Sequence, residues 1–144
     1  MQNIDLCSVS GDNLQFPISI TYNGGIQNIT GWAIYFIVKQ FQTDSDSSAL
    51  INIEVTSHLF PITGQSFLSA AGTITANLTG QYYYQFSLVD NLGNRITPIG
   101  GTYTFGANLL QNTVGGSSSG GTGATIPLFI NLQAAQPIVA TISI

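Results

Sequence analysis

Charge is what this sequence has least of. Charged residues make up 6% of its 144 positions, whereas about 25% is usual in soluble domains. Only two of them are basic, Lys39 and Arg95, against six acidic residues, and the net charge is −4. Because binding to phosphates needs clustered lysine and arginine, we expect no nucleic-acid binding.

Cysteine and long apolar runs are also scarce. Cys7 is the only cysteine, which excludes a disulfide within the chain and a metal site built from several cysteines. There is no run of 18 apolar residues, and the first ten residues lack the basic start and apolar stretch of a signal peptide. We therefore expect no membrane span and no export signal.

Groups suited to catalysis are few. His58 lies in an irregular stretch with no metal-binding pattern beside it, so we interpret it as a loop histidine. Asp44 and Asp46 have a spacing that could place two carboxylates on Ca²⁺, but the later glycine and glutamate of an EF-hand loop are missing. We favour a solvated loop there, and we expect no enzyme activity, no cofactor and no metal.

What the chain does contain is apolar and polar residues alternating with a period of two, in short segments separated by turn residues. The segments expected to be strands are residues 14–21, 31–41, 51–55, 72–79, 81–90 and 95–105. Residues 57–69 have no clean period and are expected to form a connection with room for one helical turn. Pro17 cannot donate a ladder hydrogen bond, which predicts an edge strand at 14–21.

Two of these segments allow sharper predictions. The segment 31–41 is apolar on both faces and should be a central strand, with Trp32 in the core. In the segment 81–90, alternation puts Tyr82 and Tyr84 on the apolar face and leaves Tyr83 exposed. Six or seven short strands without an amphipathic helix predict an all-β, two-layer sandwich of immunoglobulin-like type.

The composition divides the chain into three parts. Residues 1–113 form the expected β-sandwich domain, 114–123 are a Gly/Ser-rich linker, flexible by composition, and 124–144 are an apolar arm with strand-like alternation. The alternating residues of the arm, expected to act in assembly, are Ile126, Leu128, Ile130, Leu132, Ile138, Ala140, Ile142 and Ile144.

An arm of about 20 residues cannot build a core by itself, so another surface must cover its apolar face. It could fold back and complete its own sandwich, in which case the linker is a long loop. It could instead pair, as an added strand, with a sister subunit or another protein. We favour this second interpretation.

Several short motifs occur in an order that points to a known family. They are Gly11-Asp12, Asn28-Ile29-Thr30-Gly31-Trp32, Val38-Lys39, Gly80-Gln81-Tyr82-Tyr83-Tyr84, Val89-Asp90 before Gly93, and Thr97 followed by Gly100-Gly101. Over residues 10–105 the chain thereby resembles the N-terminal domain of phage baseplate upper proteins and related tail-fibre modules. The resemblance implies a virion β-sandwich that attaches to a baseplate, tail or capsid without catalysis.

The chain departs from that family after the sandwich, where the linker and arm replace the large receptor-binding or fibre part that usually follows. This difference favours an accessory protein of the virion that decorates or cements the particle. The expected partners are other virion proteins and copies of the chain itself, and phage appendages suggest a trimer. The alternative function is a host-receptor or carbohydrate-binding module of a phage tail, with Tyr83 and Tyr35 at the site.

Overall fold

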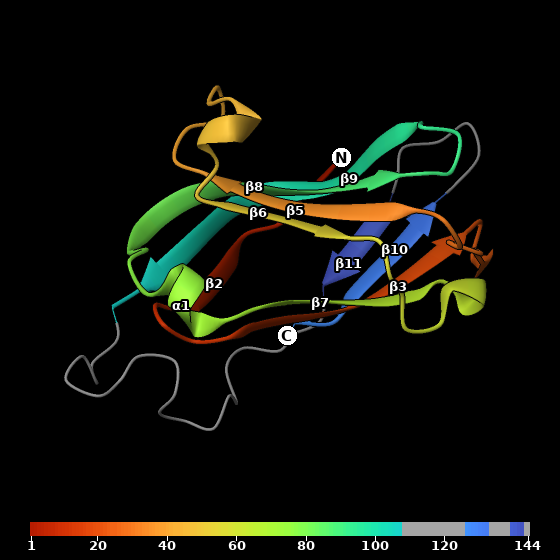
Figure 1. Cartoon of the computed structure of the whole chain (residues 1–144), viewed down its shortest axis with the longest axis horizontal. Coiled ribbons are helices and arrows are strands. Elements are labelled where there is room, and N and C mark those ends of the chain that lie inside the picture. Colours follow the sequence, from red (N-terminus) through yellow and green to blue (C-terminus); the bar gives the residue numbers. More distant parts are fainter. Residues whose placement is uncertain (108–125, 133–138, 143–144) are drawn as a thin grey trace.

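The computed structural model describes residues 1–107, 126–132 and 139–142, and the side chains of 1–107 and 126–130. The described residues form two β-sheets that lie face to face as two layers (Figure 1). The prediction of an all-β fold is confirmed. Among the described residues, no helix has the length and hydropathy needed to cross a membrane.

Sheet A, the upper layer in Figure 1, is built mainly from antiparallel neighbours. Its strands in spatial order are β6 (Ile51–Val55), β5 (Ala33–Lys39), β8 (Gly80–Val89) and β9 (Arg95–Gly106), with the short β1 (Gln2–Asn3) and β2 (Leu6–Val9) at the far edge. As predicted, β5 is central. β1 and β2 pair in parallel with β9, and they escaped the sequence analysis because they are too short to show a period.

Sheet B, the lower layer, gathers strands that are distant in sequence around β3 (Leu14–Tyr22). Its other members are β4 (Gly25–Ile26), β7 (Gln65–Ala70), β10 (Leu128–Leu132) and β11 (Val139–Ile142). The prediction of an edge strand was wrong, because β3 pairs with β7 on one side and with β10 on the other. The ladder between β3 and β10 begins at Ile18, one residue beyond Pro17, so the missing N–H group lies where that ladder has not yet started.

Two segments adopt a different structure from the one predicted. The supposed connection contains β7, whose inward residues are Ser66, Leu68 and Ala70. Two of these three are small or polar, which hid the alternation. The supposed strand at 72–79 instead begins as a single helical turn, α1 (Gly72–Thr75).

Tertiary hydrogen bonds explain the turn at α1. The buried Thr75 hydroxyl accepts a hydrogen bond from the backbone N–H of Gly11 at 3.1 Å, and it lies 3.1 Å from the carbonyl of Asp12. These bonds join α1 to the loop that follows β2. Two single turns of 3₁₀ helix, η1 (Asp46–Ser48) and η2 (Pro61–Thr63), complete the connections.

The core lies between the two sheets, and aromatic rings from both layers meet in it. Phe16 of sheet B lies 5.2 Å from Phe36 and 5.3 Å from Phe86, measured between ring centroids, and the latter two, both of sheet A, lie 4.7 Å apart. All three are completely buried. Trp32, at 9% exposure, belongs to the same core cluster, as predicted.

A β-bulge bends the hairpin of β8 and β9. Phe86 pairs with Ile99 but Leu88 pairs with Ile96, so Thr97 and Pro98 together face the single residue Ser87. Since a bulge leaves one residue without a ladder partner, it can accept a proline. In the hairpin turn that joins the two strands, Gly93 has φ of 86°.

Candidate assembly site at the C-terminal strands

The C-terminal segment lies on the domain's own sheet. β10 runs parallel to β3 from Leu128 beside Ile18 to Leu132 beside Tyr22, and β11 pairs antiparallel with β10. In Figure 1 these two blue strands extend sheet B beyond β3. Of the two arrangements left open for the arm, this single chain shows the one in which the arm returns to its own domain.

The arm side chains that the structure describes are part of the core. Ile126, Leu128 and Ile130 are 3%, 1% and 1% exposed and belong to the main hydrophobic cluster. Leu132, Ala140 and Ile142 are placed by their backbone only, while Ile138 and Ile144 lie outside the described residues. The three members of the predicted assembly set whose side chains are described therefore lie on one inward face.

Two hydrogen bonds to backbone carbonyls fix the register of the arm. The N–H of Ile126 donates to the carbonyl of Gln15 at 2.9 Å. At the other end of the ladder, the Thr21 hydroxyl donates to the carbonyl of Ile130 at 3.2 Å, across 109 positions of sequence. Since a slip by one residue would turn the apolar face outward, this register is strongly specified.

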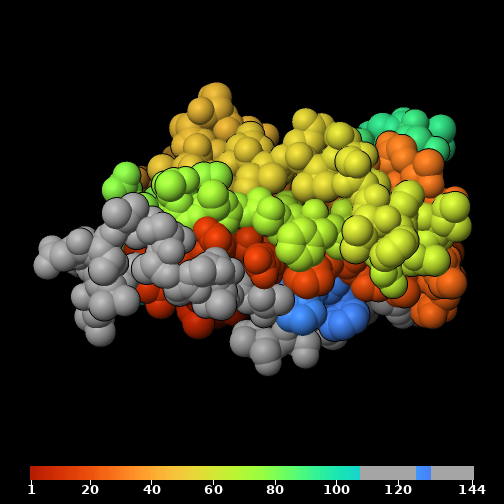
Figure 2. Space-filling model, turned by 60° about the horizontal axis from the view of Figure 1, so that its bottom comes forward, coloured from red at the N-terminus to blue at the C-terminus, as the bar shows by residue number. Residues whose placement is uncertain are grey.

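On the outside, β10 helps to form an apolar surface. Phe129 of β10 and Phe67 of β7 are 50% and 42% exposed, and they line a hollow of about 260 Å³ together with Leu59 and Pro17. Figure 2 shows the blue atoms of the C-terminal segment exposed beside the red-orange atoms of β3. Exposed aromatic side chains around a hollow are typical of protein interaction surfaces.

His58 is held in a structural position. Its Nε2 lies 2.9 Å from the carbonyl oxygen of Trp32 and its Nδ1 lies 2.8 Å from the Ser66 hydroxyl. A carbonyl only accepts, so Nε2 carries the proton, and in the neutral ring Nδ1 accepts from Ser66. The ring thus connects the residue before β5 of sheet A with β7 of sheet B, which explains why a loop histidine is fixed here.

The acidic loop has partners of its own. Asp46 accepts a hydrogen bond from Lys39 at 2.7 Å, and this bond holds the pKa of Asp46 below its ordinary value. Asp44 instead accepts from the backbone N–H of Phe41 at 3.0 Å. The two carboxylates thus bind different partners, and the described residues include no cluster of three or more His, Cys, Asp and Glu side chains that could hold a metal.

The tyrosines of sheet A divide between the core and the outer face of that sheet. Tyr84 is 3% exposed and donates to the carbonyl of Ile4 at 2.7 Å; burial raises its pKa. Tyr35 and Tyr83 are half-buried on the opposite face. Tyr35 donates to Glu54 at 2.8 Å, which raises the pKa of the phenol.

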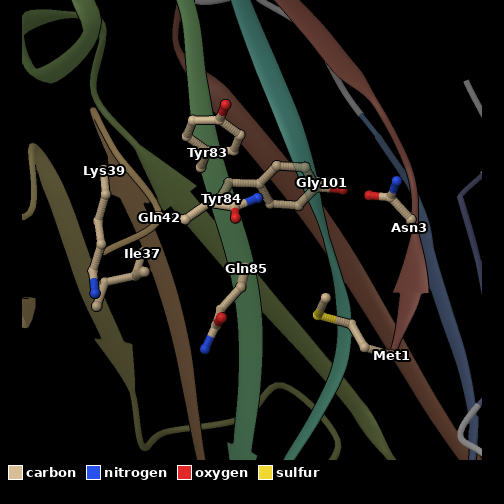
Figure 3. A pocket seen from close by; sticks show the side chains of 9 residues that line it. All are labelled: Met1, Asn3, Ile37, Lys39, Gln42, Tyr83, Tyr84, Gln85 and Gly101. Carbon is tan, nitrogen blue, oxygen red and sulfur yellow. The ribbon is translucent and has the colours of Figure 1, made fainter. Parts of the chain in front are cut away.

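A hollow of about 290 Å³ lies on the outer face of sheet A next to Tyr83. Figure 3 shows its polar walls, with Lys39 on one side, Gln85 below Tyr83 and Asn3 across β9. Gly101 also lines the hollow, and a larger residue does not fit there, because a Cβ would lie 2.2 Å from the carbonyl oxygen of Ile4. The hollow was not foreseen from the sequence, because β1 contributes one of its walls.

Three of the motifs that carry the phage resemblance contribute residues to turns of the fold. Gly11 has φ of 86° in the turn after β2. Asn28 accepts hydrogen bonds from the N–H and hydroxyl of Thr30 at 2.9 and 2.6 Å, and Asp90 accepts from the N–H groups of Leu92 and Asn94 at 2.9 Å. These residues therefore stabilise turns of the sandwich.

Comparison with known proteins adds no family. No family model matches the chain, and no curated protein matches it in sequence. The resemblance to phage baseplate upper proteins stays a prediction based on the motifs and their order.

Proposed function

We propose that this protein is a structural component of a phage virion, without a catalytic role, that acts by protein–protein assembly. The observation that carries the proposal is the placement of the motif residues Gly11, Asn28 and Asp90, which all lie in turns between the strands of one sandwich. A surface with few ions supports permanent association, because little charge is desolvated when copies meet.

The sandwich is proposed to be of immunoglobulin-like type. In such domains one sheet carries strands A, B, E and D and the other carries C, F and G. Here β3 and β7 correspond to B and E, and β5, β8 and β9 correspond to C, F and G. The position beside B, which strand A would take, is occupied by β10 from the C-terminal segment.

The virion proposal is tested on purified particles. Phage particles from the source of this sequence would be banded on a density gradient and their proteins quantified by mass spectrometry against the major capsid protein. A fixed copy number per particle that survives a high-salt wash supports a virion component. If the chain is found only in the soluble lysate, the proposal is wrong.

The hollow beside Tyr83 favours a second candidate, a carbohydrate-binding role. An aromatic ring beside amide side chains, with Lys39 neutralised by Asp46, suits a neutral polyhydroxylated ligand. A glycan array with Tyr83→Ala tests it, with Tyr22→Ala as the matched control for loss of a partly exposed tyrosine on sheet B. Specific binding that Tyr83→Ala alone removes would support this function; an array without signal would end it.

A further inference from the structure

The stretch that connects β9 to β10 is far longer than the fold requires. Gly106 accepts a hydrogen bond from Ser10, and Ile126 donates one to Gln15, each at 2.9 Å. Because Ser10 and Gln15 are only five residues apart, the two ends of the connection lie within about 30 Å of each other. Residues 107–125 can extend to about 65 Å at 3.3 Å per residue.

The position that β10 occupies would be an open sheet edge without it. β3 offers a row of backbone groups there, and the inward residues of β10 cover the core at Ile18 and Ile20, which are 3% and 0% exposed. An apolar edge of this kind accepts an added strand readily. The same edge exists on every copy of the chain.

From these two observations we propose that copies of this protein exchange their C-terminal strands. The β10–β11 segment of one copy pairs with β3 of a second copy, in the register that it has within its own chain. In the closed monomer β10 pairs with β3 of its own chain, and exchange remakes each of these contacts between copies. The equilibrium between the closed monomer and the exchanged form therefore depends on the length of the connection and on the protein concentration. This inference rests on the proposed assembly function and specifies its partner and its acceptor edge.

The closed form has an entropic advantage at low concentration. A tethered strand has an effective concentration of about 1 mM at its own edge for a short flexible linker, and less for a longer one. Exchange is therefore expected when copies are crowded, as at neighbouring positions of a particle, or when they fold together at high concentration.

The test uses a disulfide that can form only across the β3–β10 ladder. Ser19 and Phe129 are paired neighbours that face the outside of sheet B, so Ser19→Cys and Phe129→Cys leave the core intact. The exposed Cys7 is replaced by serine in every variant. Copies carrying Ser19→Cys are co-expressed with differently tagged full-length copies carrying Phe129→Cys, and they are oxidised.

The matched control uses the ladder between β3 and β7. Each of these strands has other strands of the domain before and after it in the sequence, so neither can exchange as a terminal segment. Gln15 pairs with Ser69 between β3 and β7, also on the outer face. Copies with Gln15→Cys co-expressed with copies with Ser69→Cys should give no more linked dimer than random collision does. A chain carrying both Ser19→Cys and Phe129→Cys confirms that the ladder exists in solution.

Strand exchange predicts a disulfide-linked dimer containing both tags at least tenfold above the control pair, rising with protein concentration. Linkage within the doubly substituted chain, but none between copies at millimolar concentration, would overturn the proposal. Failure of both linkages would overturn it as well, since β10 would then not pair with β3. Neither result bears on whether the chain is found in virions, so the two proposals fail separately.

Discussion

The two sheets of this protein are held together in different ways. Sheet A is mostly a series of hairpins between neighbouring segments, in which β5 pairs with β6 and β8 pairs with β9. Sheet B is built around β3, where Ile18 pairs with Ser66 on one side and Leu128 on the other. The first sheet is stabilised by local pairing, whereas the second depends on segments that must return from far along the chain.

This difference has a thermodynamic consequence. Closing a long loop costs entropy before its contacts form, so the strand that returns last should also be the easiest to release. We expect β10 to open in a partial unfolding step while sheet A stays intact. The following predictions test this expectation, in order of decreasing effect.

The largest effect is expected in the core of sheet A. Phe36→Ala removes a fully buried ring that contacts rings of both sheets, so it should lower the free energy of unfolding by about 3–5 kcal/mol. Denaturant titration followed by tryptophan fluorescence measures this loss. Amide exchange should accelerate in both sheets, and acceleration confined to sheet A would contradict the shared core.

A smaller and more local effect on stability is expected from a substitution in β10. Leu128→Ala should cost about 2–5 kcal/mol if β10 and the domain unfold together, and less if β10 opens first. Hydrogen exchange resolved by residue measures which occurs: we expect faster exchange at Ile126 and along β10, with sheet A unchanged. Phe129→Ala is the control, since its half-exposed side chain should change stability by no more than about 0.5 kcal/mol.

The hydrogen bonds of His58, which link the two sheets, should contribute less to the free energy of unfolding. His58→Ala removes the hydrogen bonds to Trp32 and Ser66 and leaves the buried Ser66 hydroxyl without this partner, at a cost of about 1–3 kcal/mol. Thermal unfolding measures the change. Ser57→Ala, at the exposed neighbouring position, should be neutral; an equal loss in both variants would show that the loop rather than the ring matters.

Alkaline pH should weaken sheet A through its buried phenols. Burial raises the pKa of Tyr103 to about 12 from the ordinary value of 10.0, so the unfolded chain loses this proton at lower pH than the folded chain. The stability from the neutral phenol is therefore complete below pH 10 and is lost as the pH rises toward 12.

Denaturant titrations across this pH range measure the loss from Tyr103. Tyr103→Phe should reduce the slope of stability against pH, although Tyr84, whose pKa is also raised by burial, keeps part of it. An unchanged slope in Tyr103→Phe would contradict this assignment.

Most of the strands that could be predicted from the sequence lie in sheet A, and β3 of sheet B is the exception. β5 and β6 alternate between inward and outward residues, and β8 and β9 are joined by a turn that Asp90 and Gly93 identify. β7 was missed because its inward positions include Ser66 and Ala70. The candidate site was predicted in part: alternation identified the inward residues of β10 but could not say which sheet edge covers them.

The sequence by itself determined the all-β class, the central strand β5 and the apolar face of the C-terminal segment, because each follows from side-chain periodicity along a short stretch. Only the tertiary structure decided that Gly72–Thr75 forms a turn, that Pro17 lies in an inner strand, and that Ile126, Leu128 and Ile130 complete the core beside β3. Those outcomes depend on which distant backbone groups meet, and periodicity along one segment carries no information about its neighbour in space.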